Sequence, residues 1–95
     1  MADVLDAAAL DRGLSGLDGW AGTPTEGISK TYRFDDFNGS VAFVNRVAEI
    51  ADEADHHPDV AISWNRVTLT YLTHSLGGVT AADLEQAAAV DERAA

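Results

Sequence analysis

The chain has 95 residues, 46% of them hydrophobic and none of them cysteine, so we expect one domain over residues 1–95 without disulfides, thiol nucleophiles or thiolate metal sites. Sixteen acidic against six basic residues give a formal net charge of −10, which repels a phosphate backbone and argues against nucleic-acid binding. No apolar run approaches the roughly 20 residues of a membrane span and the first residues lack a signal-peptide pattern, so we expect a cytoplasmic protein without membrane contact.

A short helix is predicted near the N-terminus. Asp3 stands three residues before Asp6 and ahead of a helically spaced apolar set, a pattern typical of a capped helix start at Asp3 (Leu5, Ala8, Ala9). Trp20 follows a turn. An indole there is more often at the edge of a core than part of a ligand platform, and both interpretations stay open.

Two strands are expected next. Residues 20–26 contain Gly, Pro and Thr and predict a weak edge strand. Residues 28–34 alternate between apolar and polar side chains, which predicts a strand with one mostly apolar face. Lys30 interrupts this alternation, and an edge position or a long stem that reaches solvent would explain it.

The longest predicted helix follows Asp35 and Asp36, which can cap it, although Ser40 is an alternative N-cap. Its apolar positions form a wide stripe at helical spacing (Phe37, Val41, Val44, Val47, Ala48, Ile50, Ala51). The last turn is acidic, with Asp52, Glu53 and Asp55, whereas the helix dipole favours cations at this end.

His56 and His57 are the nearest cations that this acidic turn could stabilise, in their imidazolium form. Pro58 disfavours helical backbone at the preceding residue, so the two histidines should leave the helix and enter a strand. Imidazole titrates near neutral pH, which makes both histidines candidates for acid or base chemistry. The alternative is a solvated helix end with surface histidines.

Two alternating apolar runs, at residues 60–64 and 67–71, predict a β-hairpin. If Asn65 and Arg66 form a two-residue turn, the opposed pairs are Trp64 with Val67, Ile62 with Leu69, and His57 with His74. This register brings all three histidines to one end of the hairpin. Arg66 is poorly suited to positive φ, so a longer turn with another register stays open.

A third helix is predicted after Gly77 and Gly78. Thr80 and Asp83 have the spacing of a capping box, which gives Asp83 a complete structural explanation. The alanine-rich tail after Val90 should fray.

These residues, in this order and spacing, closely resemble the pterin-4a-carbinolamine dehydratase family. The resemblance covers about Trp20 to Ala88 and is carried by an ordered set of side chains (Asp52, His56, His57, Pro58, Trp64, His74, Asp83). It implies an α+β fold in the order α-β-β-α-β-β-α, with three helices on one face of a four-stranded antiparallel sheet. It also implies dehydration of 4a-hydroxytetrahydropterin to quinonoid dihydropterin, which regenerates the pterin of aromatic amino-acid hydroxylases, without a cofactor or metal.

The resemblance also implies roles for individual residues. His56 and His74 would be the acid/base pair, and His57 would contribute to catalysis and orient the substrate. The substrate-binding residues would further include Asp52, which holds the histidines, the neighbouring Asp55 and Pro58, and Trp20 beside the pterin ring. The family resemblance and the sheet edges predict a homodimer or homotetramer.

Two other functions stay open at this point. Relatives of this family also act as dimerisation partners of transcription regulators, so the chain could be a non-catalytic binding partner of a regulatory protein. The three histidines could instead form a zinc site. Against zinc, adjacent histidines on an extended segment tend to point apart, and nearby carboxylates already account for the cluster.

Overall fold

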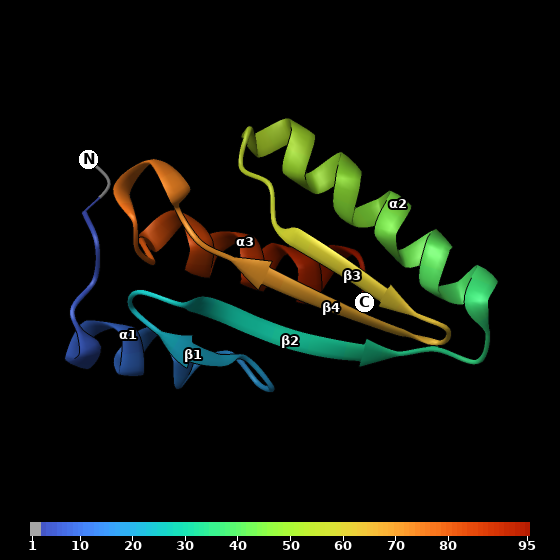
Figure 1. Cartoon of the computed structure of the whole chain (residues 1–95), viewed down its shortest axis with the longest axis horizontal. Helices are drawn as coiled ribbons and strands as arrows, with labels where there is room; N and C mark the ends of the chain where they lie inside the picture. Colours follow the sequence, from blue (N-terminus) through green and yellow to red (C-terminus); the bar gives the residue numbers. More distant parts are fainter. Residues whose placement is uncertain (1–2) are drawn as a thin grey trace.

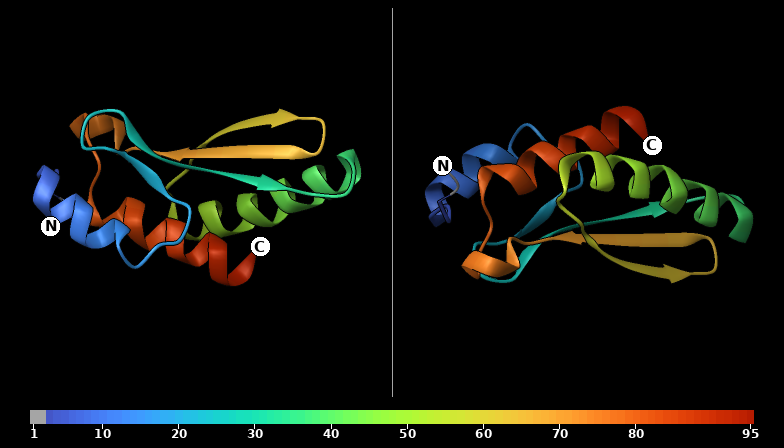
Figure 2. Two further views of the ribbon diagram at one scale, coloured as in Figure 1. Left: turned by 90° about the horizontal axis from the view of Figure 1, so that it is seen from below. Right: turned by 90° about the horizontal axis from the view of Figure 1, so that it is seen from above.

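Residues 3–95 are described by the computed structural model, and they form the predicted α-β-β-α-β-β-α order of elements. The elements are α1 (Ala7–Leu14), β1 (Ala21–Thr23), β2 (Gly27–Arg33), α2 (Phe37–Ala54), β3 (Asp59–Ser63), β4 (Arg66–Tyr71), the 3-10 turn η1 (His74–Leu76) and α3 (Ala81–Arg93). The strands form one antiparallel sheet in the order β1-β2-β4-β3. All three helices cover the same face of it (Figures 1 and 2). No helix in this part of the chain is long and apolar enough to cross a membrane.

The two central strands supply the sheet side of the core. Their inward side chains are buried, at Ile28 and Tyr32 of β2 and at Val67, Leu69 and Tyr71 of β4. β1 is the short edge strand predicted before residue 27, and all its residues are exposed. β3 is the other edge, and all five of its residues are exposed as well. The core therefore lies between β2, β4 and the helices.

The long helix begins where the aspartates predicted, because the Asp36 side chain accepts a hydrogen bond from the Gly39 N–H. Ser40 is not the cap. Its hydroxyl is buried and donates to the Trp64 carbonyl. The buried face of α2 includes Phe43, which the predicted stripe omitted, whereas Phe37 is half exposed. The stripe is so wide that its sequence alone does not identify the side that meets the sheet.

The predicted hairpin is present, but its register was wrong. The observed partners are Ile62 with Val67 and Val60 with Leu69, two residues away from the predicted pairing, and the turn is at Trp64 and Asn65. A shift of two residues keeps every side chain on its predicted face.

The reason for this turn lies outside the hairpin. Asn65 is held to Phe34 at the end of β2, because its carbonyl accepts from the Phe34 N–H at 2.8 Å and its side-chain amide donates to the Phe34 carbonyl at 3.1 Å. Trp64 has a positive φ of 53°, which is uncommon for a bulky residue, and its carbonyl accepts from the Ser40 hydroxyl of α2. Tertiary contacts therefore override local turn preference.

The two terminal helices differ from the prediction in their ends. α1 is capped by Asp6 rather than Asp3, since the Asp6 carboxylate accepts from the Ala9 N–H. The predicted fraying after Val90 was also wrong, because α3 continues to Arg93. Asp91 anchors this last turn by accepting hydrogen bonds from Trp20 Nε1 and Lys30 Nζ, both at 3.0 Å, and from the Tyr32 hydroxyl. The polar tail is thus tied to the sheet by a carboxylate.

Candidate active site

The end of α2 directs the two adjacent histidines away from the helix. Asp55 adopts left-handed backbone, with φ 51° and ψ 43°. Its N–H donates to the Asp52 carbonyl, and the His56 N–H donates to the Ala51 carbonyl at 3.1 Å, which together make a Schellman motif. The chain therefore reverses at Asp55, so that His56 and His57 lie between α2 and β3.

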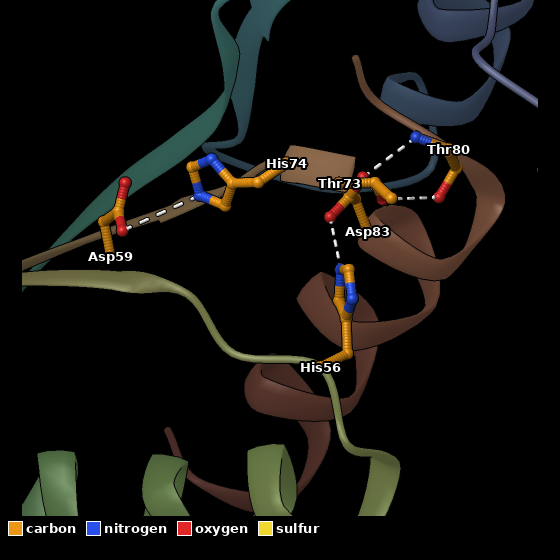
Figure 3. A network of polar contacts seen from close by, with 6 residues as sticks. All are labelled: His56, Asp59, Thr73, His74, Thr80 and Asp83. Carbon is orange, nitrogen blue, oxygen red and sulfur yellow. Dashed lines mark hydrogen bonds and ion pairs between the residues drawn. The ribbon is translucent and has the colours of Figure 1, made fainter. Parts of the chain in front are cut away.

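His56 points into the molecule and pairs with a buried carboxylate. Its Nε2 lies 2.5 Å from Oδ1 of Asp83, which is fully buried at the start of α3 (Figure 3). The other carboxylate oxygen accepts from the Thr73 hydroxyl at 2.8 Å and from the Thr80 N–H at 2.9 Å. An ionised carboxylate only accepts, so His56 Nε2 carries the proton of this contact. His56 Nδ1 has no hydrogen-bond partner within residues 3–95.

The Tyr71 ring stacks against the His56 ring. The two rings are nearly parallel, at 9°, with their centroids 5.9 Å apart. The Tyr71 hydroxyl is buried and lacks a hydrogen-bond partner in the described part of the chain. Burial, together with the nearby Asp83 charge, raises the pKa of Tyr71 to about 12. Tyr71 is therefore neutral at physiological pH and acts as an apolar wall.

His57 points the other way and is exposed. Its Nε2 lies 2.9 Å from Oδ1 of Asp52 one helical turn back in α2. His57 and Pro58 also line an open apolar groove of about 140 Å³ between α2 and β3, together with side chains from both elements (Val44, Val47, Ala48, Ala51, Val60). Ligand pockets usually measure about 300–1,000 Å³, so the groove can hold only part of a ligand.

The third histidine lies just beyond the end of β4. His74 begins η1 and is exposed, with its Nε2 3.9 Å from Oδ1 of Asp59 at the start of β3 (Figure 3). The predicted direct opposition of His57 and His74 is absent, because strand pairing ends at Asp59 and Thr70. The antiparallel hairpin nevertheless brings all three histidines to the same end of the sheet, as the sequence predicted.

The three imidazoles do not converge on one point. Each has a different carboxylate neighbour: Asp83 for His56, Asp52 for His57 and Asp59 for His74. Within residues 3–95 no three His, Asp or Glu side chains are arranged to hold a metal ion. The geometry is that of separate histidine–carboxylate pairs, which suits proton transfer.

Trp20 lies in the core next to Tyr71. Its indole is 5% exposed and packs against Tyr32 and Tyr71, while Nε1 donates to Asp91. The core interpretation of this residue is therefore confirmed, and its place beside a bound pterin stays a prediction. Trp20 and His56 both pack against Tyr71, so Tyr71 connects them.

Sequence reasoning missed the second role of Asp83. The capping box predicted with Thr80 is present, but the same carboxylate also holds His56. The predicted capping role of Asp83 was thus correct, but it did not include the contact with His56. Thr73 and Tyr71 were not assigned a role in the site either. The available signal was position, because Tyr71 ends β4 and Thr73 directly precedes His74 in the chain.

The chain is similar to known proteins over nearly its whole length. The family described as Pterin 4 alpha carbinolamine dehydratase matches residues 3–93. The chain belongs to that family. A protein of Thermosynechococcus vestitus with the provisional name pterin-4-alpha-carbinolamine dehydratase is 43% identical over 99% of this chain and 98% of its own length. A protein of Sulfolobus acidocaldarius with the same provisional name is 42% identical over 93% of this chain and 96% of its own.

Two solved structures that resemble this chain are described with different functions. A transcriptional coactivator/pterin dehydratase from Brucella melitensis superposes with a TM-score of 0.90 at 33% identity, over 98% of this chain and 100% of that one. A pterin dehydratase-like protein identified as a RuBisCO assembly factor in the alpha-carboxysome has a TM-score of 0.61 at 26% identity, over 77% of this chain and 83% of its own. The fold is therefore shared by proteins that are described with different functions.

Proposed function

We propose that this chain dehydrates a 4a-hydroxytetrahydropterin to the quinonoid dihydropterin. The reaction removes water: a proton is delivered to the departing 4a-hydroxyl, and one is taken from N5 of the pterin. Both steps need groups that exchange protons near neutral pH, and imidazole is the side chain suited to this. Neither step needs a redox cofactor or a metal.

The observation that carries this proposal is the pairing of His56 with buried Asp83. The carboxylate orients the imidazole by accepting from Nε2, while Nδ1 stays available to a substrate. Such a histidine can deliver a proton and later recover it. A solvated surface histidine would need neither a buried carboxylate nor a stacked aromatic ring.

His74 is the second member of the proposed acid/base pair. It is exposed and lies near Asp59, at the same end of the sheet as His56. We assign His57, at the mouth of the apolar groove, to catalysis and substrate orientation. Asp52 would hold His57, through the 2.9 Å contact.

The other substrate-binding assignments have weaker structural support. Pro58 lines the groove beside His57, and Asp55 sets the direction of the histidine segment. The role of Trp20 beside the pterin ring is supported only by the resemblance. Its indole contacts in this chain are with Tyr32, Tyr71 and Asp91.

The test is dehydration of a carbinolamine pterin by the purified protein, followed by absorbance and corrected for the spontaneous reaction. We expect catalysis that persists in a strong chelator and that falls when His74 is replaced by alanine. A folded protein that does not accelerate the reaction would overturn the proposal. It would favour the alternative of a non-catalytic partner of a regulatory protein, a role suggested by the description of the Brucella melitensis protein as a transcriptional coactivator.

We further propose that the chain forms a homodimer or homotetramer. β3 is an open edge strand, and its core-facing side chains Val60 and Ile62 remain 43% and 40% exposed. Open apolar edges favour pairing with another chain. Light scattering at micromolar concentration and physiological salt should give a mass above that of one chain, and a monomer would contradict this.

The proposed cellular role is pterin recycling for an aromatic amino-acid hydroxylase in the cytoplasm. This role depends on the dehydratase activity, because the quinonoid product is the form that is reduced back to the hydroxylase pterin. Deletion of the gene should lower hydroxylase-dependent growth or product formation if the role is correct. An unchanged phenotype would separate the activity from this partner.

A further inference from the structure

Thr73 joins the two proposed acid/base histidines through a single carboxylate. It directly precedes His74 in the chain, and its hydroxyl lies 2.8 Å from Oδ2 of Asp83, while Oδ1 of the same carboxylate holds His56 (Figure 3). The Thr73 side chain thus contacts Asp83, the partner of His56, and its backbone is bonded directly to that of His74.

The direction of each hydrogen bond in this network follows from donor counting. Asp83 is fully buried and accepts from three donors: the His56 imidazole, the Thr73 hydroxyl and the Thr80 N–H. The Thr73 proton is used on Asp83, so in the 2.9 Å contact between the two threonines the Thr80 hydroxyl is the donor. The three groups that contact the carboxylate therefore act as donors, and the donor in the His56 contact is Nε2–H.

The loop itself does not need the Thr73 hydroxyl. The Thr73 N–H donates to the Gly78 carbonyl at 3.0 Å, and the Thr73 carbonyl accepts from the N–H groups of Leu76 and Gly77, both at 3.0 Å. These main-chain bonds hold η1 whatever side chain occupies position 73. The Thr73 hydroxyl is thus available to donate to the Asp83 carboxylate.

We propose that Thr73 is a positioning residue, whose hydroxyl holds the Asp83 carboxylate so that His56 presents Nδ1 as the proton-exchanging atom, at the same end of the sheet as His74. The effect on rate rests on the proposed dehydratase function. The effect on the His56 tautomer does not, because it depends only on the hydrogen bonds of the network.

The first measurement uses the wild-type protein and the ¹⁵N chemical shifts of its imidazoles at about pH 9, above the usual range of histidine titration. We expect His56 to be in the Nε2–H tautomer, with Nδ1 unprotonated. The Nδ1–H tautomer would overturn the proposal. This measurement needs no substitution and no substrate.

The second measurement compares three variants that change one threonine each. Thr73→Val keeps the side-chain shape and removes the hydroxyl, and Thr73→Ser keeps the hydroxyl. Thr68→Val is the matched control on β4, because it removes an exposed hydroxyl pair with Thr31 at 2.8 Å that does not touch the histidines. Residues that orient metal-ligating histidines typically contribute about 10–100-fold in affinity or activity, and we expect the same range for a residue that orients a catalytic histidine.

We expect Thr73→Val to lower kcat by about 10–100-fold with KM changed less than about twofold, and to mix the His56 tautomers. Thr73→Ser should recover most of the rate, and Thr68→Val should resemble wild type. A folded Thr73→Val protein with wild-type kcat and wild-type His56 shifts would overturn the proposal. If wild type does not catalyse dehydration, the proposed function fails, and the His56 shifts of wild type and Thr73→Val still decide the positioning role.

Discussion

His56 and His57 follow the end of α2, and each of them pairs with a carboxylate. The two histidine–carboxylate pairs differ in burial. His56 and Asp83 are 18% and 0% exposed, whereas His57 and Asp52 are 55% and 77% exposed. The two contacts have similar atoms and similar distances, 2.5 Å and 2.9 Å. Adjacent residues on an extended segment point to opposite sides, which is why neighbours in sequence have such different surroundings.

Burial gives the two pairs different energetic weight. Water and salt screen an exposed ion pair, which then contributes about 0–1 kcal/mol, whereas removing one partner of a buried pair costs about 3–5 kcal/mol. The buried pair is also bound by Thr73, Thr80 and Tyr71, so its geometry is fixed before any ligand arrives. The exposed pair can move with a ligand. We therefore expect His56 to affect chemistry and His57 to affect binding at least as strongly.

The largest expected effect comes from replacing His56, His57 and His74 one at a time by alanine. Loss of a positioned acid or base removes about 10²–10⁴-fold in rate, so His56→Ala should lower kcat within this range, and more than His74→Ala. His57→Ala should raise KM at least as much as it lowers kcat. Steady-state dehydration from about pH 6 to 9, with folding checked by circular dichroism, measures this. Wild-type kcat in folded His56→Ala and His74→Ala proteins would exclude both as catalytic groups.

The next effect concerns stability. Asp83→Ala leaves His56, Thr73 and the Thr80 N–H without their acceptor and should lower the free energy of unfolding by about 3–5 kcal/mol. The matched change Asp52→Ala should cost less than about 1 kcal/mol, because that pair is exposed. Urea denaturation of both variants gives the two values. Equal losses would show that burial does not distinguish the pairs.

Two buried tyrosines should respond with opposite signs to the same substitution. Tyr71→Phe removes a hydroxyl that lies near His56 and has no hydrogen-bond partner among residues 3–95, so it should be neutral or stabilise by up to about 1–3 kcal/mol. Tyr32→Phe removes the hydrogen bond to Asp91 and should destabilise by about 0.5–3 kcal/mol. Thermal and urea unfolding at neutral pH test this, and a large loss from Tyr71→Phe would show that its hydroxyl is bonded.

The same tyrosines predict a loss of stability in alkali. Burial raises the pKa of Tyr71 to about 12, and burial with the Asp91 hydrogen bond also raises the pKa of Tyr32. Because tyrosine titrates near pH 10 when unfolded, this contribution is complete below about pH 10 and is lost as the pH rises toward about 12. Unfolding free energy measured from pH 8 to 12 should fall over this interval, and less steeply in Tyr71→Phe. A flat profile would contradict the assigned burial.

The smallest expected effect concerns Asp55. It distinguishes the role of its left-handed backbone from the role of its carboxylate. Glycine adopts left-handed backbone without strain, so Asp55→Gly should change stability by no more than about 1 kcal/mol, whereas Asp55→Ala should destabilise. If the carboxylate binds substrate, both variants should raise KM equally. If Asp55 only reverses the chain, KM should stay at the wild-type value in Asp55→Gly.

Much of the architecture was predictable because it depends on local pattern. Alternation over residues 28–34 and 67–71, the cap at Asp36 and the capping box at Thr80 each involve residues within a few positions of one another. The gathering of the histidines at one end of the sheet also followed, since an antiparallel hairpin must bring its two outer ends together. The ordered histidine motif was enough to recognise the family.

The sequence by itself therefore determined the order of elements, the faces of the strands and the residue types of the site. Only the tertiary structure decided the hairpin register, the anchoring of the last turn of α3 by Asp91, and the burial that separates His56 from His57. Each of these depends on residues far apart in the chain, such as Asn65 with Phe34 and His56 with Asp83. Long-range packing removes water from one histidine–carboxylate pair and leaves it around the other, and no local pattern encodes that difference.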